Sequence, residues 1–89
     1  MKLLIITLDF NPNTSGHEEV YDAIKLQGTW WHYMKSTWLV QTAKSVQQVS
    51  DAIGPLMKPK GRMLVAELHR PYQGLQVPDA WAWINSRVT

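Results

Sequence analysis

The stretch from Gly28 to Thr42, GTWWHYMKSTWLVQT, is the part of this chain that says most about its fold. Its two halves, 30–34 and 37–42, are rich in the aromatic and β-branched residues that favour strands. Lys35 and Ser36 between them allow a tight reversal of the chain. The stretch therefore predicts a β-hairpin of two antiparallel strands.

Alternation along this hairpin places its aromatic side chains on two faces. Successive side chains of a strand point to opposite sides, so Trp30 and His32 share one face while Trp31 and Tyr33 share the other. Trp38 on the second strand is expected to lie opposite one of these pairs. One set of rings then enters the core, and the other stays exposed.

Upstream of the hairpin, the pattern predicts a strand and then a helix. Residues 2–10, KLLIITLDF, form an apolar run without clean alternation, which is typical of a central strand covered on both faces. The turn NPNTSG follows this run. Ser15 and Glu18 have the spacing of a helix capping box, and Gly28 ends the predicted helix.

Downstream, the pattern predicts a helix, a strand and a final short helix. Ser45 and Gln48 form a second capping box, and the following apolar residues up to Met57 fall on one helical face. Alternation over residues 63–69 predicts the fourth strand. The tail from 77 to 88, VPDAWAWINSRV, begins with the Pro and Asp that open a helix.

This order of elements predicts an α+β fold of the ferredoxin-like type. It reads β-α-β-β-α-β with a short C-terminal helix, which gives one antiparallel sheet with two helices on one face. The other face of the sheet needs a cover. Either the C-terminal helix or a partner subunit can supply it, so we expect a homodimer or a higher oligomer.

Length and composition limit the possibilities further. The chain has 89 residues, of which 45% are hydrophobic and 18% charged. It is therefore expected to form a single globular domain over residues 1–89. The absence of cysteine excludes disulfides and thiolate metal sites, and it fits a cytoplasmic protein. No apolar stretch approaches the roughly 18 residues of a membrane span. The net charge of +2 permits an anionic partner without requiring one.

Three segments carry a resemblance to a known family. The first predicted strand ends in LDFN at residues 8–11, a G-x-W-x-H pattern follows at Gly28, Trp30 and His32, and STWLVQT spans residues 36–42. In these segments the chain resembles the SinR-like group of small proteins. That group is distantly similar to the small CRISPR-associated ferredoxin-like protein of the spacer-integration complex.

The resemblance implies a ferredoxin-like fold and a dimer. In the CRISPR-associated family, an aspartate at the end of the first strand is linked to metal-dependent nuclease activity, and Asp9 matches that position. A nuclease of this kind would use Mg²⁺ held by Asp9 of each subunit, because one carboxylate alone is too few for such a site. The alternative is that Asp9 caps the turn that follows it.

The residues themselves favour binding of a nucleotide or nucleic acid without strong catalysis. Aromatic rings stack on bases, while cations and hydroxyls meet phosphate. The protein would thus sequester or sense a small signalling nucleotide, or bind a nucleic acid strand, and would need no cofactor. The predicted ligand-binding residues are Trp30, His32, Lys35, Ser36, Thr37 and Trp38 of the hairpin, with Asn11, Thr14 and Ser15 of the first turn.

Two other functions remain open. One is the metal-dependent nuclease with catalytic Asp9. The other is a structural subunit whose three hairpin tryptophans fill the core or a protein interface. Histidines are too scattered, at positions 17, 32 and 69, to predict a zinc site.

Overall fold

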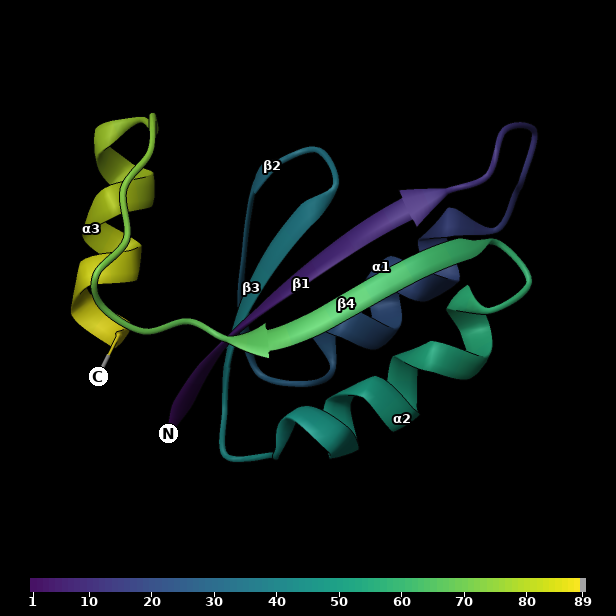
Figure 1. Cartoon of the computed structure of the whole chain (residues 1–89), viewed down its shortest axis with the longest axis horizontal. Helices are drawn as coiled ribbons and strands as arrows, with labels where there is room; N and C mark the ends of the chain where they lie inside the picture. The colour runs from purple at the N-terminus through teal and green to yellow at the C-terminus, as the bar shows by residue number, and fades with distance from the viewer. Residues whose placement is uncertain (89) are drawn as a thin grey trace.

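The computed structural model describes residues 1–88 as an α+β fold with a four-stranded antiparallel sheet and three helices (Figure 1). None of the helices in this part of the chain is long and apolar enough to cross a membrane. The order of elements is the predicted one. They are β1 (Lys2–Phe10), α1 (His17–Lys25), β2 (Thr29–Met34), β3 (Thr37–Thr42), α2 (Val46–Met57), β4 (Gly61–Glu67) and α3 (Pro78–Arg87).

β1 is a central strand, as its unbroken apolar run predicted. The strands lie in the order β2-β3-β1-β4, so β1 pairs with β3 on one side and with β4 on the other. In this register Ile6 lies opposite both Trp38 and Val65. Leu4 and Leu3, which point to opposite faces, are both buried. Because both faces of the first half of β1 are covered, that half shows no alternation of apolar and polar residues.

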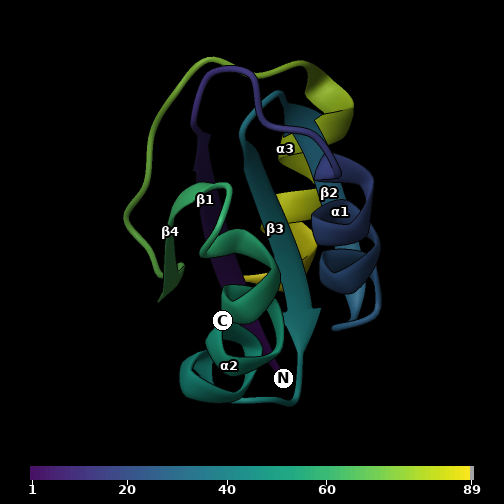
Figure 2. The ribbon, with the colours of Figure 1, turned by 90° about the vertical axis from the view of Figure 1, so that its right-hand side faces the viewer.

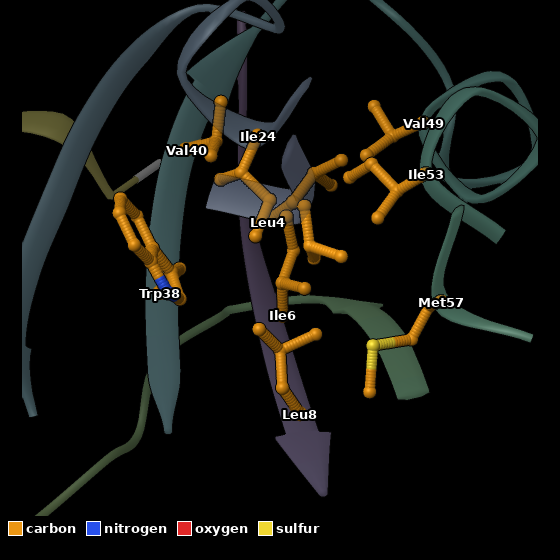
Figure 3. Close-up of a cluster of buried hydrophobic side chains, with 10 residues drawn as sticks. Leu4, Ile6, Leu8, Ile24, Trp38, Val40, Val49, Ile53 and Met57 are labelled. Carbon is orange, nitrogen blue, oxygen red and sulfur yellow. The ribbon is translucent and has the colours of Figure 1, made fainter. Parts of the chain in front are cut away.

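The helices cover both faces of the sheet (Figures 1 and 2). α1 and α2 cover one face, where they enclose the main hydrophobic core. α3 covers part of the other face, where it encloses a smaller cluster. The main core contains Leu4, Ile6, Leu8, Val20, Ile24, Trp38, Val40, Val49, Ile53 and Met57 (Figure 3). The smaller cluster contains Leu3, Trp31, Leu39, Ala80 and Ile84.

The predicted capping box at the start of α1 is wrong. The helix begins at His17 behind Gly16, which serves as the N-cap without any side-chain hydrogen bond. Asn13 and Gly16 both have a left-handed backbone, with φ of 63° and 76°. These two bends place Ser15 outside the helix, so its hydroxyl does not reach the first turn.

The capping box at the start of α2 is confirmed. The Ser45 hydroxyl accepts a hydrogen bond from the Gln48 backbone N–H at 3.1 Å, and the Gln48 side chain accepts one from the Ser45 N–H at 2.9 Å. Two backbone N–H groups that the helix itself leaves unpaired are thereby satisfied.

Replacing Ser45 with alanine is therefore expected to lower the free energy of unfolding by about 1 kcal/mol. Ser15→Ala is the matched control, because Ser15 caps no helix in this structure. It should change stability by less than about 0.5 kcal/mol. Urea denaturation of the two variants measures both values, and equal losses would contradict the assignment of the caps.

β4 begins two residues before the predicted start and ends two residues before the predicted end. It spans Gly61–Glu67 rather than 63–69, because β1 continues to pair with it as far as Phe10 opposite Gly61. This close pairing requires glycine. A Cβ atom at position 61 would lie 2.0 Å from the carbonyl oxygen of Asp9.

Candidate functional site

A cleft of about 400 Å³ opens where β1 ends, between the β1–α1 loop and the turn that joins β2 to β3. A backbone hydrogen bond holds this turn beside β1, because the Leu8 N–H donates to the Ser36 carbonyl at 2.8 Å. The cleft is lined by Asp9, Phe10, Asn11, Pro12, Asn13, Thr14, His17, Tyr21, Lys35 and Ser36.

Half of the predicted site residues line this one cleft. They come from two segments that are distant in the sequence but adjacent in the sheet. The five are Asp9, Asn11, Thr14, Lys35 and Ser36. The other five do not line it. Ser15 belongs to the β1–α1 loop but is exposed away from the cleft lining, and Thr37 lines a hollow on the α3 side of the sheet. The remaining three are aromatic residues of the hairpin.

Thr14 organises the β1–α1 loop. Its hydroxyl lies 2.9 Å from the Asn11 carbonyl oxygen and 2.9 Å from Nε2 of His17. A hydroxyl carries one hydrogen, and a carbonyl can only accept, so the hydroxyl donates to Asn11. It then accepts from His17, whose Nε2 must carry a hydrogen. The loop therefore holds the His17 ring in one orientation and one tautomer.

Three aromatic side chains form one wall of the cleft. The rings of Phe10 and His17 are stacked, with centroids 3.7 Å apart and planes 17° apart. Tyr21 meets Phe10 edge to face at 6.0 Å. All three side chains are partly exposed, so the wall is apolar but accessible from the cleft. Such a wall suits a flat ligand ring.

His32 positions the opposite wall without lining it. Its Nε2 lies 3.1 Å from the carbonyl oxygen of Lys35, and this geometry makes the ring nitrogen the donor. The same ring stacks on Trp38, with centroids 3.7 Å apart and planes 11° apart. Trp38 belongs to the core, so His32 links the turn that carries Lys35 to the rigid centre of the sheet.

The three hairpin tryptophans have different environments. Trp31 and Trp38 are 2% and 1% exposed, so neither offers a free ring face to a ligand. Trp30 is 44% exposed, but Lys25 Nζ lies 5.0 Å from the centre of one of its rings. Alternation does place Trp30 and Trp31 on opposite faces of the sheet, but exposure does not follow the faces, because Trp31 is buried whereas Tyr33 of the same predicted pair is exposed. Only Trp30 is available for stacking, and it lies outside the cleft.

Asp9 is the one acidic residue of the cleft among residues 1–88. It lies directly opposite Arg62 on β4, yet the two side chains form no ion pair in this part of the chain. Nowhere in residues 1–88 do three histidine, aspartate or glutamate side chains gather as metal ligands. A magnesium ion at Asp9 would therefore draw its remaining ligands from water, from a phosphate or from a second copy of the chain.

The sequence analysis missed the aromatic wall. His17 and Tyr21 are four residues apart in α1, and this spacing places both on one face of a helix. Phe10 shares a strand face with Leu8 and Ile6 by alternation. These two signals were present, but only the packing of α1 beside the end of β1 shows that both faces meet.

No protein-family model, curated protein or solved structure matches this chain. The function of the cleft is therefore inferred from its own geometry and chemistry.

Proposed function

We propose that this protein binds a nucleotide in the cleft at the end of β1. The observation that supports this proposal is the convergence of an aromatic wall with polar residues predicted to hold phosphate and ribose. Phe10, His17 and Tyr21 come from the end of β1 and from α1, and Lys35 and Ser36 come from the β2–β3 turn. A base stacks on the first group while a phosphate meets the second.

The charges of the cleft suggest the orientation of the ligand. Lys35 is the cation of the lining and Asp9 the acid, so a phosphate lies near Lys35 and away from Asp9. The Asp9 carboxylate, which only accepts hydrogen bonds, then receives a ribose hydroxyl or a base amino group. Asn11 and Thr14 offer further polar contacts at the same edge.

The size of the cleft favours a small ligand. Pockets for small molecules begin at about 300 Å³. The cleft measures about 400 Å³, which is near that lower limit. This volume suits a mononucleotide, half of a cyclic dinucleotide, or one nucleotide of a single strand. Sequestering or sensing a signalling nucleotide requires only binding, which the aromatic wall and the Lys35 turn can supply.

The proposal includes a ferredoxin-like fold and a homodimer. The strand order β2-β3-β1-β4, with α1 and α2 on one face, supports the ferredoxin-like fold. The helix α3 is an addition to that fold.

The part of the sheet that α3 leaves open supports the homodimer. Leu64 on that face is 66% exposed. A second copy of the chain packed against this open part of the sheet would cover it. Membership of the SinR-like group remains a prediction.

The test is calorimetric titration with AMP, GMP, cyclic di-AMP, a short oligothymidylate and a DNA duplex. We expect Lys35→Gln to weaken the binding of the preferred nucleotide about tenfold, because one charge-assisted hydrogen bond to phosphate is lost. The uncharged nucleoside of the same base should bind both proteins equally. Lys58→Gln is the matched control, because Lys58 is exposed and does not line the cleft.

Two outcomes would contradict the proposal. One is the absence of binding by every ligand at millimolar concentration. The other is an equal loss in the Lys35 and Lys58 variants, which would indicate attraction by overall charge rather than a site at this cleft.

A further inference from the structure

We propose a second binding site, for a small aromatic carboxylic acid, between the sheet and the C-terminal segment of residues 68–88. It lies on the α3 face of the sheet, whereas the rings of the nucleotide cleft belong to the α1 side. The proposal rests on two adjoining hollows, one apolar and one cationic. It is independent of the nucleotide proposal.

The apolar hollow lies beneath α3. Its volume is about 210 Å³, and its walls come from the sheet and from the C-terminal segment. A dry apolar cavity of about 150 Å³ in another protein is large enough to hold benzene. The hollow therefore has room for an aromatic ring with a short substituent. The apolar walls are Ile5, Trp31 and Leu39 of the sheet with Leu68, Trp81 and Ile84 of the segment.

The cationic hollow adjoins the apolar one. It measures about 440 Å³ and is lined by Arg70, Pro71, Tyr72, Gln73, Trp81 and Asn85. The two hollows share Tyr72, Gln73 and Trp81 as lining residues, so they lie next to each other. The rings of Tyr72 and Trp81 are nearly parallel, with planes 15° apart and centroids 6.0 Å apart. This stacked pair borders both hollows.

The chemistry of the cationic hollow suits a carboxylate. The Arg70 guanidinium lies 5.8 Å from the centre of the Tyr72 ring. Within residues 1–88 the Arg70 guanidinium forms no ion pair, so its N–H groups can form two parallel bonds to a carboxylate. The Tyr72 hydroxyl donates to Oδ1 of Asn85, so the Asn85 amide keeps its own N–H donors. Of residues 1–88, no acidic side chain lines either hollow.

The anchoring of α3 allows the ligand to enter. Trp31 Nε1 donates to the Ala80 carbonyl at 3.4 Å, and the Gln76 amide donates to the Met34 sulfur at 3.1 Å. The first bond is long and the second has a weak acceptor, so little hydrogen-bond energy opposes a ligand at this edge of the segment. An aromatic ring then fills the apolar hollow while its carboxylate reaches Arg70.

The test is a titration of the protein with 3-phenylpropionate. Binding is monitored through the ¹H–¹⁵N NMR signals of the tryptophan indole N–H groups. We expect saturable shifts of the Trp31 and Trp81 signals and no shift of Trp30, which lies on the other face of the sheet. The uncharged analogue 3-phenylpropanol should bind about tenfold more weakly. Arg70→Gln should reduce the affinity for the acid to that for the alcohol.

Arg62→Gln is the matched control, because Arg62 is an exposed arginine on β4 that lines neither hollow. It should leave the affinity for 3-phenylpropionate unchanged. Arg70 is itself exposed and pairs with no acid within residues 1–88, so its replacement should not unfold the protein. The inference is overturned if the Trp31 and Trp81 signals do not shift at millimolar probe. Equal binding of acid and alcohol, or unchanged binding by the Arg70 variant, overturns it as well.

Discussion

Replacing Trp38 with alanine is expected to lower the free energy of unfolding by about 4 kcal/mol, the range for a fully buried large aromatic residue. Trp38 is 1% exposed and lies in the main core, facing Leu4 and Ile6 of β1 (Figure 3). Its removal leaves a cavity beside the centre of the sheet. It also removes the ring on which His32 stacks, so the turn that carries Lys35 loses its support. Urea denaturation followed by circular dichroism measures the loss.

Two further variants test the same prediction. Within residues 1–88 the Trp38 indole N–H has no hydrogen-bond acceptor, so Trp38→Phe keeps an aromatic ring and removes an unsatisfied donor. Its cost should be smaller, about 1 to 2 kcal/mol. Trp30 has a ring that is 44% exposed. Trp30→Ala should therefore cost less than about 1 kcal/mol. A Trp38→Ala protein as stable as Trp30→Ala would contradict the position of Trp38 in the core.

The second large effect is expected at Gly61. A Cβ atom there would lie 2.0 Å from the Asp9 carbonyl oxygen and 3.0 Å from the Phe10 Cα, so β1 and β4 must separate locally. Gly61→Ala should therefore lower the free energy of unfolding by about 3 kcal/mol. Asp9 and Phe10 both line the cleft at the end of β1. The variant should consequently weaken the proposed nucleotide binding even at temperatures where it is fully folded.

Gly54→Ala is the matched control for this prediction. Gly54 lies inside α2, and the nearest atom to an added Cβ is the Met63 methyl carbon at 4.0 Å, an ordinary contact. Alanine is the better helix former, but Pro55 follows Gly54 inside α2, and a Cβ on the residue before a proline crowds the proline ring in a helix. Because these two effects oppose each other, Gly54→Ala should change the free energy of unfolding by less than about 1 kcal/mol. Thermal unfolding distinguishes the two variants by the size of the fall in Tm. A Gly61→Ala protein with a raised Tm would contradict the close pairing of β1 and β4.

The local elements were predictable because short-range physics determines them. The hairpin strands require only β-prone residues around a tight turn, and the cap of α2 requires a serine and a glutamine three positions apart. The predicted capping box of α1 was wrong despite a similar sequence pattern, because the left-handed backbone at Asn13 and Gly16 separates Ser15 from the helix. A spacing rule does not include such bends.

The candidate site was predictable in part for the same reason. Turn residues with hydroxyl, amide and ammonium groups, such as Thr14, Asn11 and Lys35, stand out in the sequence because they follow strands. The aromatic wall does not stand out. Phe10, His17 and Tyr21 read locally as core residues, and their common edge exists only after α1 packs beside the end of β1.

Local patterns in the chain were enough to predict the order of strands and helices, the central place of β1 and the division of the hairpin rings between two faces, because periodicity and turn chemistry act over a few residues. Which faces meet depended on the packing of whole elements. Contacts between distant segments arise from that packing, and no local pattern encodes them. This packing buries Trp38 in the core and brings the β1–α1 loop next to the turn that carries Lys35. It also places α3 over the sheet, with Arg70 near the apolar hollow.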